Sequence, residues 1–181
     1  MDLLSLEIAD ARGAHDFIGL NYFVGEETAF EIRRPIELFG RAVHDLESQK
    51  WTPTFAGVAR AQPDGLETAL RRLAQYGRPI YVTENGVFET GGHNQARYLV
   101  SHLAAVQRAL QAGVPVRGYF WWSLVDNFEW SEGYGPRFGL YHLDRESQQR
   151  TARPVAEVYA RIIRENGIDA ELAREFLASN P

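Results

Sequence analysis

Two short segments of the sequence place carboxylates among side chains that can act on a polar ligand. The first, Ile-Tyr-Val-Thr-Glu-Asn-Gly at residues 80–86, is an apolar and β-branched run that ends in a carboxylate. Strand alternation predicts that Ile80, Val82 and Glu84 share one face, so that the carboxylate follows two apolar side chains into the interior. Such a carboxylate is a helix N-cap, a structural ion pair or a catalytic group, and spacing alone leaves these alternatives open.

The second segment, Trp-Trp-Ser-Leu-Val-Asp-Asn-Phe-Glu-Trp at residues 121–130, combines hydrogen-bond acceptors with flat apolar rings and holds three of the four tryptophans. A sugar matches both features, because its hydroxyls pair with carboxylates and its C–H face packs on an aromatic plane. Tryptophans can also simply fill a core, and we expect this of Trp121, which faces away from Trp122. Glu129 beside Trp130 fits a core less well, since a buried carboxylate needs a partner.

The elements that would position these groups alternate between strand and helix. Strands are expected at residues 16–23, 79–83 and 116–124, and helices are expected to end at Gly77 and Gly113 and to run from Pro154 to Gly167. This order is typical of βαβ units and predicts an α/β fold with a parallel sheet. Chemistry in such folds lies at the carboxyl ends of strands, where Asn21, Glu84 and Trp122 fall.

Two long excursions, which are connecting segments outside this alternation of strands and helices, are expected at residues 24–62 and 126–153. The second is expected to contain a hairpin around residues 138–144. The chain has 181 residues, a net charge of −5 and no cysteine. There is no basic stripe, long apolar run, signal-like leader or paired-histidine spacing. We therefore expect no nucleic-acid or membrane partner, no metal, no cofactor and a cytoplasmic location.

Four motifs in order carry a family resemblance. They are Asp-Phe-Ile-Gly-Leu-Asn-Tyr at 16–22, Val-Thr-Glu-Asn-Gly at 82–86, Trp-Ser-Leu-Val-Asp-Asn-Phe-Glu-Trp at 122–130, and Gly-Tyr at 133–134 with Arg-Phe-Gly-Leu at 137–140. Together they closely resemble the C-terminal part of family 1 glycoside hydrolases, the β-glucosidases and their relatives. The resemblance implies a partial (β/α)8 TIM barrel, with residues 1–181 forming one segment that contains strands six to eight, their helices and a preceding helix at 2–11.

The resemblance also implies site roles in a retaining β-glycosidase. Glu84 resembles the nucleophile, and Asn21 a residue near the nucleophile and the sugar 2-hydroxyl. Trp122 resembles the platform under the glycone. The same resemblance implies three further residues of the pocket. Glu129 would accept from the 4- and 6-hydroxyls, Trp130 would donate to the 3-hydroxyl, and Phe138 would form a wall. By the same resemblance, Glu129 and the absence of lysine from 129 to 140 favour an unphosphorylated sugar, because relatives that take 6-phosphorylated sugars typically replace the acidic residue and place serine and lysine in this stretch.

Two departures from the family pattern stand out. Phe23 occupies the position of a tyrosine that usually donates to the nucleophile, and the Asn-Glu-Pro motif of the acid/base is absent. Because such barrels typically need about 250 residues, we expect a C-terminal part that is inactive without its acid/base half. Its expected partners are a β-glycoside or sugar, and either the missing N-terminal half or a second copy. The alternatives are a non-catalytic sugar-binding or self-assembling half-barrel module and a truncated product without function.

Overall fold

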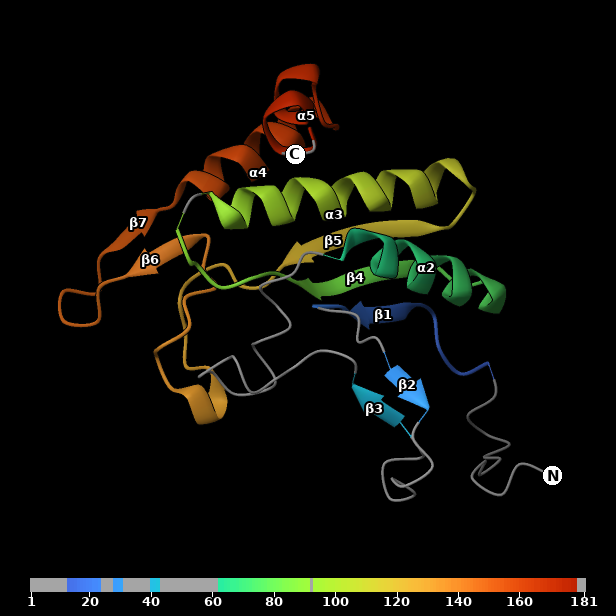
Figure 1. Ribbon diagram of the computed structural model, residues 1–181, viewed down its shortest axis with the longest axis horizontal. Coiled ribbons are helices and arrows are strands. Elements are labelled where there is room, and N and C mark those ends of the chain that lie inside the picture. Colours follow the sequence, from blue (N-terminus) through green and yellow to red (C-terminus); the bar gives the residue numbers. More distant parts are fainter. Residues whose placement is uncertain (1–12, 24–27, 31–39, 43–61, 92, 179–181) are drawn as a thin grey trace.

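The computed structural model describes residues 13–23, 28–30, 40–42, 62–91 and 93–178. At its centre is a three-stranded parallel sheet in the order β1 (Ile18–Asn21), β4 (Ile80–Asn85) and β5 (Val116–Trp121) (Figure 1). The other elements are β2 (Thr28–Phe30), β3 (Gly40–Ala42), α2 (Pro63–Leu73), η5 (Ala74–Tyr76), α3 (Asn94–Gln111), η6 (Trp130–Glu132), β6 (Tyr141–Leu143), β7 (Arg150–Ala152), α4 (Pro154–Glu165) and α5 (Ala170–Phe176). The expected alternation of strands and helices around a parallel sheet is confirmed.

The helices begin and end where local sequence rules place them. Proline occupies the first position of α2 and of α4, where its missing N–H leaves no intrahelical bond unmade. The chain leaves the helical conformation at Gly77 and Gly113 with positive φ angles of 63° and 82°. For α4 the left-handed residue is Asn166, with φ 49°, one residue before the expected glycine.

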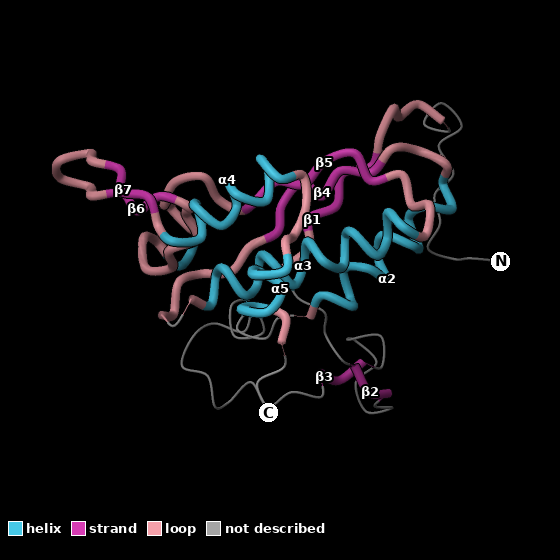
Figure 2. Tube along the Cα trace, turned by 90° about the horizontal axis from the view of Figure 1, so that it is seen from above, coloured by secondary structure: helices cyan, strands magenta, loops and turns pink. Residues whose placement is uncertain are grey.

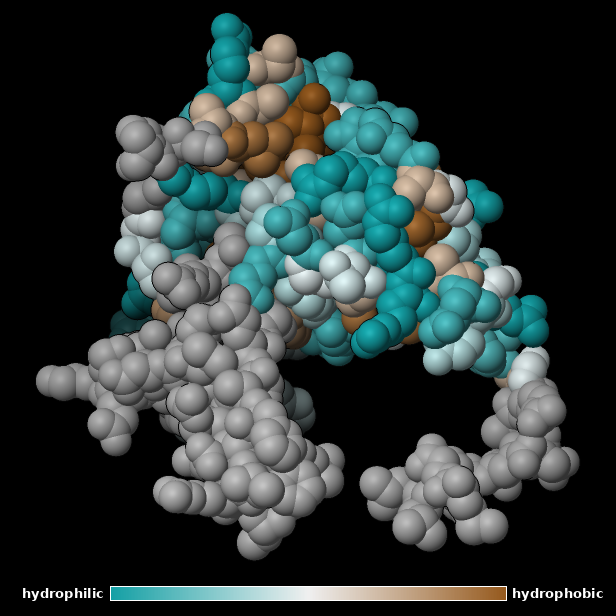
Figure 3. All heavy atoms as spheres, turned by 45° about the vertical axis from the view of Figure 1, so that its right-hand side comes forward, coloured by the Kyte–Doolittle hydropathy of each residue, from teal (hydrophilic) through white to brown (hydrophobic). Residues whose placement is uncertain are grey.

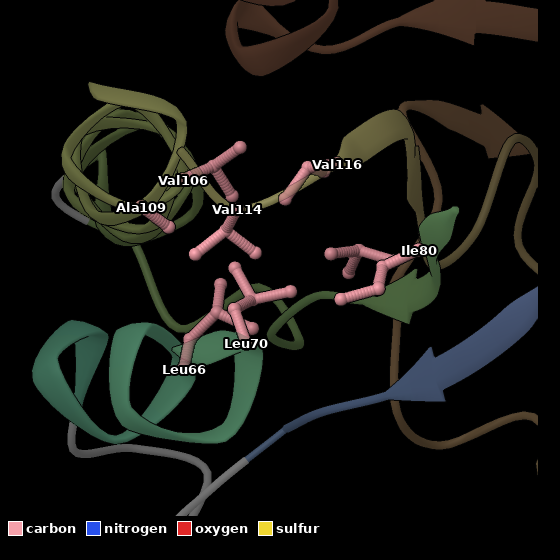
Figure 4. Close-up of a cluster of buried hydrophobic side chains, with 8 residues drawn as sticks. Leu66, Leu70, Ile80, Val106, Ala109, Val114 and Val116 are labelled. Carbon is pink, nitrogen blue, oxygen red and sulfur yellow. The ribbon is translucent and has the colours of Figure 1, made fainter. Parts of the chain in front are cut away.

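Helices α2 and α3 cover one face of the sheet, as Figures 1 and 2 both show. Leu66 and Leu70 of α2, Ile80 of β4 and side chains of α3 and β5 point toward one another between these layers (Figure 4). Val82 of β4 belongs to the same buried cluster. Those four side chains are completely buried. Full burial of one aliphatic side chain contributes about 1.5–3 kcal/mol, so this layer fixes the strands firmly against the helices.

The opposite face of the sheet carries aromatic side chains. Phe17 and Tyr81 meet edge to face, with their ring centroids 5.3 Å apart. Phe17 is 54% exposed, and Phe120, which precedes the buried Trp121, is 56% exposed. The two faces therefore differ, since the described helices bury the first and leave large rings accessible on the second.

The segment after β5 leads to the second excursion and the C-terminal helices. The antiparallel hairpin there consists of β6 and β7, so it begins later and extends further than the expected span of 138–144. Helices α4 and α5 pack on α3 through a small apolar cluster that includes Ile162, Leu172 and Phe176. Figure 3 shows a hydrophobic patch at the height of these helices on an otherwise largely hydrophilic face. The expected helix at 2–11 lies outside the described residues, as does most of the excursion at 24–62.

Candidate functional site

The ends of the three parallel strands bring the predicted site residues to one edge of the sheet. Asn21 at the end of β1 pairs in register with Glu84 of β4, and the Tyr22 N–H donates to the Glu84 carbonyl at 2.8 Å. On the other side of β4, the Trp122 N–H donates to the Asn85 carbonyl at 3.0 Å. Asn21, Glu84 and Trp122 are thus held side by side by backbone hydrogen bonds.

A β-bulge decides the direction of the Glu84 side chain and corrects the expectation from alternation. Ile80 and Val82 face the helices, but the pairing skips a residue between Val82 and Asn85, and the next helix-facing side chain is Asn85. Neighbouring residues in a strand point to opposite faces, so Glu84 lies on the face away from α2 and α3. The prediction that Glu84 shares the face of Ile80 and Val82 was wrong, because the bulge inserts an extra residue into the pattern.

Asn21 is oriented by a neighbour on β4. The Thr83 hydroxyl donates to the Asn21 side-chain oxygen at 2.7 Å, and the Asn21 side chain is exposed at the strand end. Because its oxygen accepts this bond, the N–H groups of the Asn21 amide are left for other acceptors at the edge of the sheet.

Glu129 is buried and hydrogen-bonded to Trp122. It is 4% exposed, and the Trp122 indole N–H donates to its carboxylate at 3.2 Å. Burial raises the pKa of the Glu129 carboxyl above its ordinary value, the hydrogen bond from Trp122 opposes this, and the negative charges of Glu84 and Asp126 add to it. Two carboxylates that repel each other and an indole ring therefore make up the centre of the site.

An ion pair fixes the loop that carries this centre. The Arg153 guanidinium donates to both Asp126 oxygens at 2.9 and 2.8 Å, and the Gly139 N–H donates to one of them. Burial would raise the pKa of Asp126, but the hydrogen bonds and charge of Arg153 lower it below its ordinary value. A side chain at Gly139 would overlap the Asp126 backbone. Sequence reasoning assigned no role to Asp126 or Arg153, although Asp126 lies within the quoted motif.

Trp130 and Phe138 lie in contrasting environments. Trp130 opens the short helix η6 with a positive φ of 46° and is 82% exposed. Phe138 was expected at the pocket wall, but it is 1% exposed and belongs to the core cluster beneath the site, where Phe23 and Phe88 contact it edge to face. Trp121, expected in the core, is 7% exposed and its indole N–H donates to the Phe138 carbonyl.

The described ranges show two further negative findings. They contain no group of three or more histidine, aspartate or glutamate side chains arranged to hold a metal ion. They also contain no helix that is both long and apolar enough to cross a membrane.

Comparisons with known proteins agree with this geometry. Residues 3–168 match the family model described as glycosyl hydrolase family 1. A β-galactosidase of Sulfolobus acidocaldarius is 40% identical over 167 residues, which cover 90% of this chain and 34% of that protein. Beta-glucosidase A of Thermotoga maritima is 36% identical, with 90% and 37% covered.

Solved structures give the same result. A β-glycosidase from Pyrococcus horikoshii superimposes with a TM-score of 0.78 at 36% identity over 91% of this chain and 38% of that one. A Thermotoga maritima β-glucosidase in complex with glucoimidazole matches with a TM-score of 0.71 at 32% identity, covering 84% and 35%. The chain thus spans about a third of the length of these relatives and matches part of their barrel. On these grounds the chain belongs to glycosyl hydrolase family 1.

Proposed function

We propose that this chain is the nucleophile-bearing part of a retaining β-glycosidase and corresponds to strands six to eight of the family barrel. The observation that carries the proposal is the placement of Glu84 at the end of the central strand, beside Asn21 and within electrostatic range of the buried Glu129. Retaining glycosidases use one carboxylate as a nucleophile and a second, roughly 5 to 5.5 Å away, as acid and then base.

In the proposed reaction a Glu84 oxygen attacks the anomeric carbon of a β-glycoside. The new bond joins this oxygen to the sugar, the bond between the anomeric carbon and the leaving oxygen breaks, and its electron pair departs with the aglycone. Water then attacks the anomeric carbon and loses a proton to the acid/base group, which gave its own proton to the aglycone in the first step. The bond between the sugar and the Glu84 oxygen breaks, and its electron pair restores the carboxylate as the sugar leaves. We assign no described residue to the acid/base and place it in the two thirds of the relatives that this chain does not match.

The glycone would be recognised by the groups around Glu129. The Trp122 ring offers a flat face for the C–H side of a sugar, and the Glu129 carboxylate accepts from its hydroxyls. Trp130 is exposed and free to donate its indole N–H to another hydroxyl, and the Asn21 amide is placed to reach the sugar near Glu84. Phe138, which is buried, supports this surface from beneath. A glucose- or galactose-type unphosphorylated glycone suits this set.

Covalent labelling tests the proposal without requiring the acid/base. A 2-deoxy-2-fluoro-β-glucoside with a dinitrophenolate leaving group needs no proton on its aglycone, and the fluorine slows hydrolysis of the glycosyl-enzyme. Intact-mass and peptide mass spectrometry should find one fluorodeoxyglucosyl group on Glu84. The Glu84→Gln variant should remain unlabelled, and Glu89→Gln, on the following loop, should label like the parent.

Labelling of another carboxylate would contradict the assignment of Glu84. If nothing is labelled while glucoimidazole still binds by calorimetry, the chain is a non-catalytic sugar-binding module. Absence of both labelling and binding, from the chain alone and from the chain mixed with polypeptide corresponding to the unmatched two thirds, would refute both readings.

A further inference from the structure

A buried amide lies directly behind Glu84. The Asn85 side chain is completely buried and makes three hydrogen bonds. Its Nδ2 donates to the Tyr22 carbonyl at 2.6 Å and to the Tyr98 hydroxyl at 2.9 Å, while its Oδ1 accepts from the Tyr119 hydroxyl at 2.6 Å. One amide thus connects the chain just after β1, helix α3 and strand β5.

The donors and acceptors of this cluster fit in one arrangement only. The Tyr22 carbonyl can only accept, so it must face the Asn85 nitrogen, which leaves the oxygen for the Tyr119 hydroxyl. The Tyr98 hydroxyl has one proton and donates it to the Phe23 carbonyl at 2.7 Å, so it accepts from Asn85. The orientation of the amide is therefore fixed by its partners.

The Tyr98 ring is itself held in place from behind. His102, one helical turn further along α3, stacks on it with ring centroids 3.8 Å apart and an interplanar angle of 19°. The His102 Nδ1 lies 2.8 Å from the Tyr98 carbonyl, which requires Nδ1 to carry the proton. A rigid helix thus presents the Tyr98 hydroxyl to the strand ends.

We propose that Asn85 and Tyr98 are positioning residues that set the face of the sheet on which Glu84 lies. Asn85 can satisfy its hydrogen bonds only from the helix side, and the residue before it must then point to the other side. Without this anchor, plain alternation would return Glu84 to the face of Ile80 and Val82, where its carboxylate would meet the apolar core. The effect on catalysis rests on the proposed function, whereas the effect on the strand ends does not.

The test compares two isosteric substitutions, of the buried Tyr98 and of the partly buried Tyr159. Tyr98→Phe keeps the ring and its stack on His102 but removes the hydroxyl that bridges Asn85 and Phe23. Tyr159→Phe is the matched control, because the Tyr159 hydroxyl donates at 2.9 Å to the Tyr119 backbone carbonyl and does not touch the Asn85 amide. Asn85→Asp is a second variant of similar size, in which an oxygen would face the Tyr22 carbonyl.

Hydrogen exchange reports on position whether or not the chain reacts with sugars. The amides of Tyr22 and Trp122 donate to the carbonyls of Glu84 and Asn85. In Tyr98→Phe their protection should fall roughly tenfold or more relative to the parent, because the Phe23 carbonyl loses a donor and the Asn85 Nδ2 loses an acceptor. The melting temperature of Tyr98→Phe should match that of Tyr159→Phe, because each variant loses one tyrosine hydroxyl. In Tyr159→Phe the protection of both amides should stay within about twofold of the parent. Equal protection in the parent, Tyr98→Phe and Asn85→Asp would overturn the proposal.

Labelling kinetics supply the functional measurement. With the fluorinated glucoside, Tyr98→Phe should reduce the maximal labelling rate of Glu84 roughly tenfold while the concentration for half-maximal rate changes little. A normal maximal rate with weaker binding would contradict a positioning role. If the parent itself is not labelled, the proposed function fails, and the exchange measurement still decides whether Asn85 and Tyr98 set the strand ends.

Discussion

His102 should make the stability of this protein fall between neutral and mildly acidic pH. Its side chain is completely buried, its Nδ1 is used by the Tyr98 carbonyl, and its Nε2 has no hydrogen-bond partner among the described residues. Burial lowers the pKa of His102 from 6.5 to about 4, and the hydrogen bond to Tyr98 only partly opposes this. Tyr98, Tyr22 and Ser101, which contact the ring, supply no negative charge that would favour the imidazolium.

The magnitude follows from the two pKa values. The folded pKa lies below the unfolded one, so the unfolded chain binds the proton first and stability is lost as the pH falls below about 6.5. The difference of about 2.5 pH units corresponds to about 3 kcal/mol once both states are protonated. About 2 kcal/mol of this should already be lost between pH 7 and pH 5.

Denaturant unfolding at pH 7 and pH 5, followed by tryptophan fluorescence, measures this loss. The His102→Gln variant retains a donor for the Tyr98 carbonyl but does not titrate. Its free energy of unfolding should therefore change between the two pH values by about 2 kcal/mol less than that of the parent. The exposed His15→Gln is the control and should follow the parent. The same pH dependence in His102→Gln as in the parent would refute the reasoning.

Three other substitutions test the site. Glu129→Gln removes a carboxylate whose pKa burial raises, so thermal unfolding should show equal or greater stability at pH 7, while calorimetry should show roughly tenfold weaker binding of glucoimidazole. In the parent that binding should weaken as the pH falls through the raised pKa, and a flat pH profile would contradict a role for the ionised form. Gly86→Ala would place a side-chain atom on the Trp122 carbonyl oxygen and should lower the free energy of unfolding by about 1–3 kcal/mol; an unchanged value would show that the strands separate easily. Arg153→Met leaves the Asp126 carboxylate without the Arg153 guanidinium and should lower the free energy of unfolding by about 3 kcal/mol. A change below about 1 kcal/mol would mean that solvent already screens the ion pair.

Local rules were enough to predict the parallel sheet, the helices α2, α3 and α4, and the strand ends that become neighbours. Proline at a first helical turn, glycine at a left-handed helix end and short β-branched runs each act within a few residues. Thus Gly77 and Gly113 end their helices as expected, and the strand ends at Asn21 and Glu84 become neighbours because parallel strands place their carboxyl ends together.

The features that were missed depend on contacts between distant parts of the chain. The bulge at Glu84 follows from the bonds of Asn85 to Tyr22 and Tyr119, which lie 63 and 34 positions away. Alternation along one strand carries no information on such partners. In the same way, burial of Phe138 depends on rings contributed by other segments, and it does not follow from the motif in which this residue stands.

Because β4 is the middle strand, the two carboxylates of the site differ in mobility. The backbone around Glu84 is hydrogen-bonded on both sides, to the chain after β1 and to the chain after β5. The segment from Trp122 to Trp130 is hydrogen-bonded through its backbone mainly to one neighbour, residues 138–141, and the Asp126 carboxylate is held by Arg153. Opening of β4 requires two neighbours to separate, whereas the aromatic segment has one main neighbour and can shift together with it. In the proposed glycosidase, adjustment to sugars of different shape would therefore fall to the loop of Glu129, while the backbone that carries Glu84 stays in place.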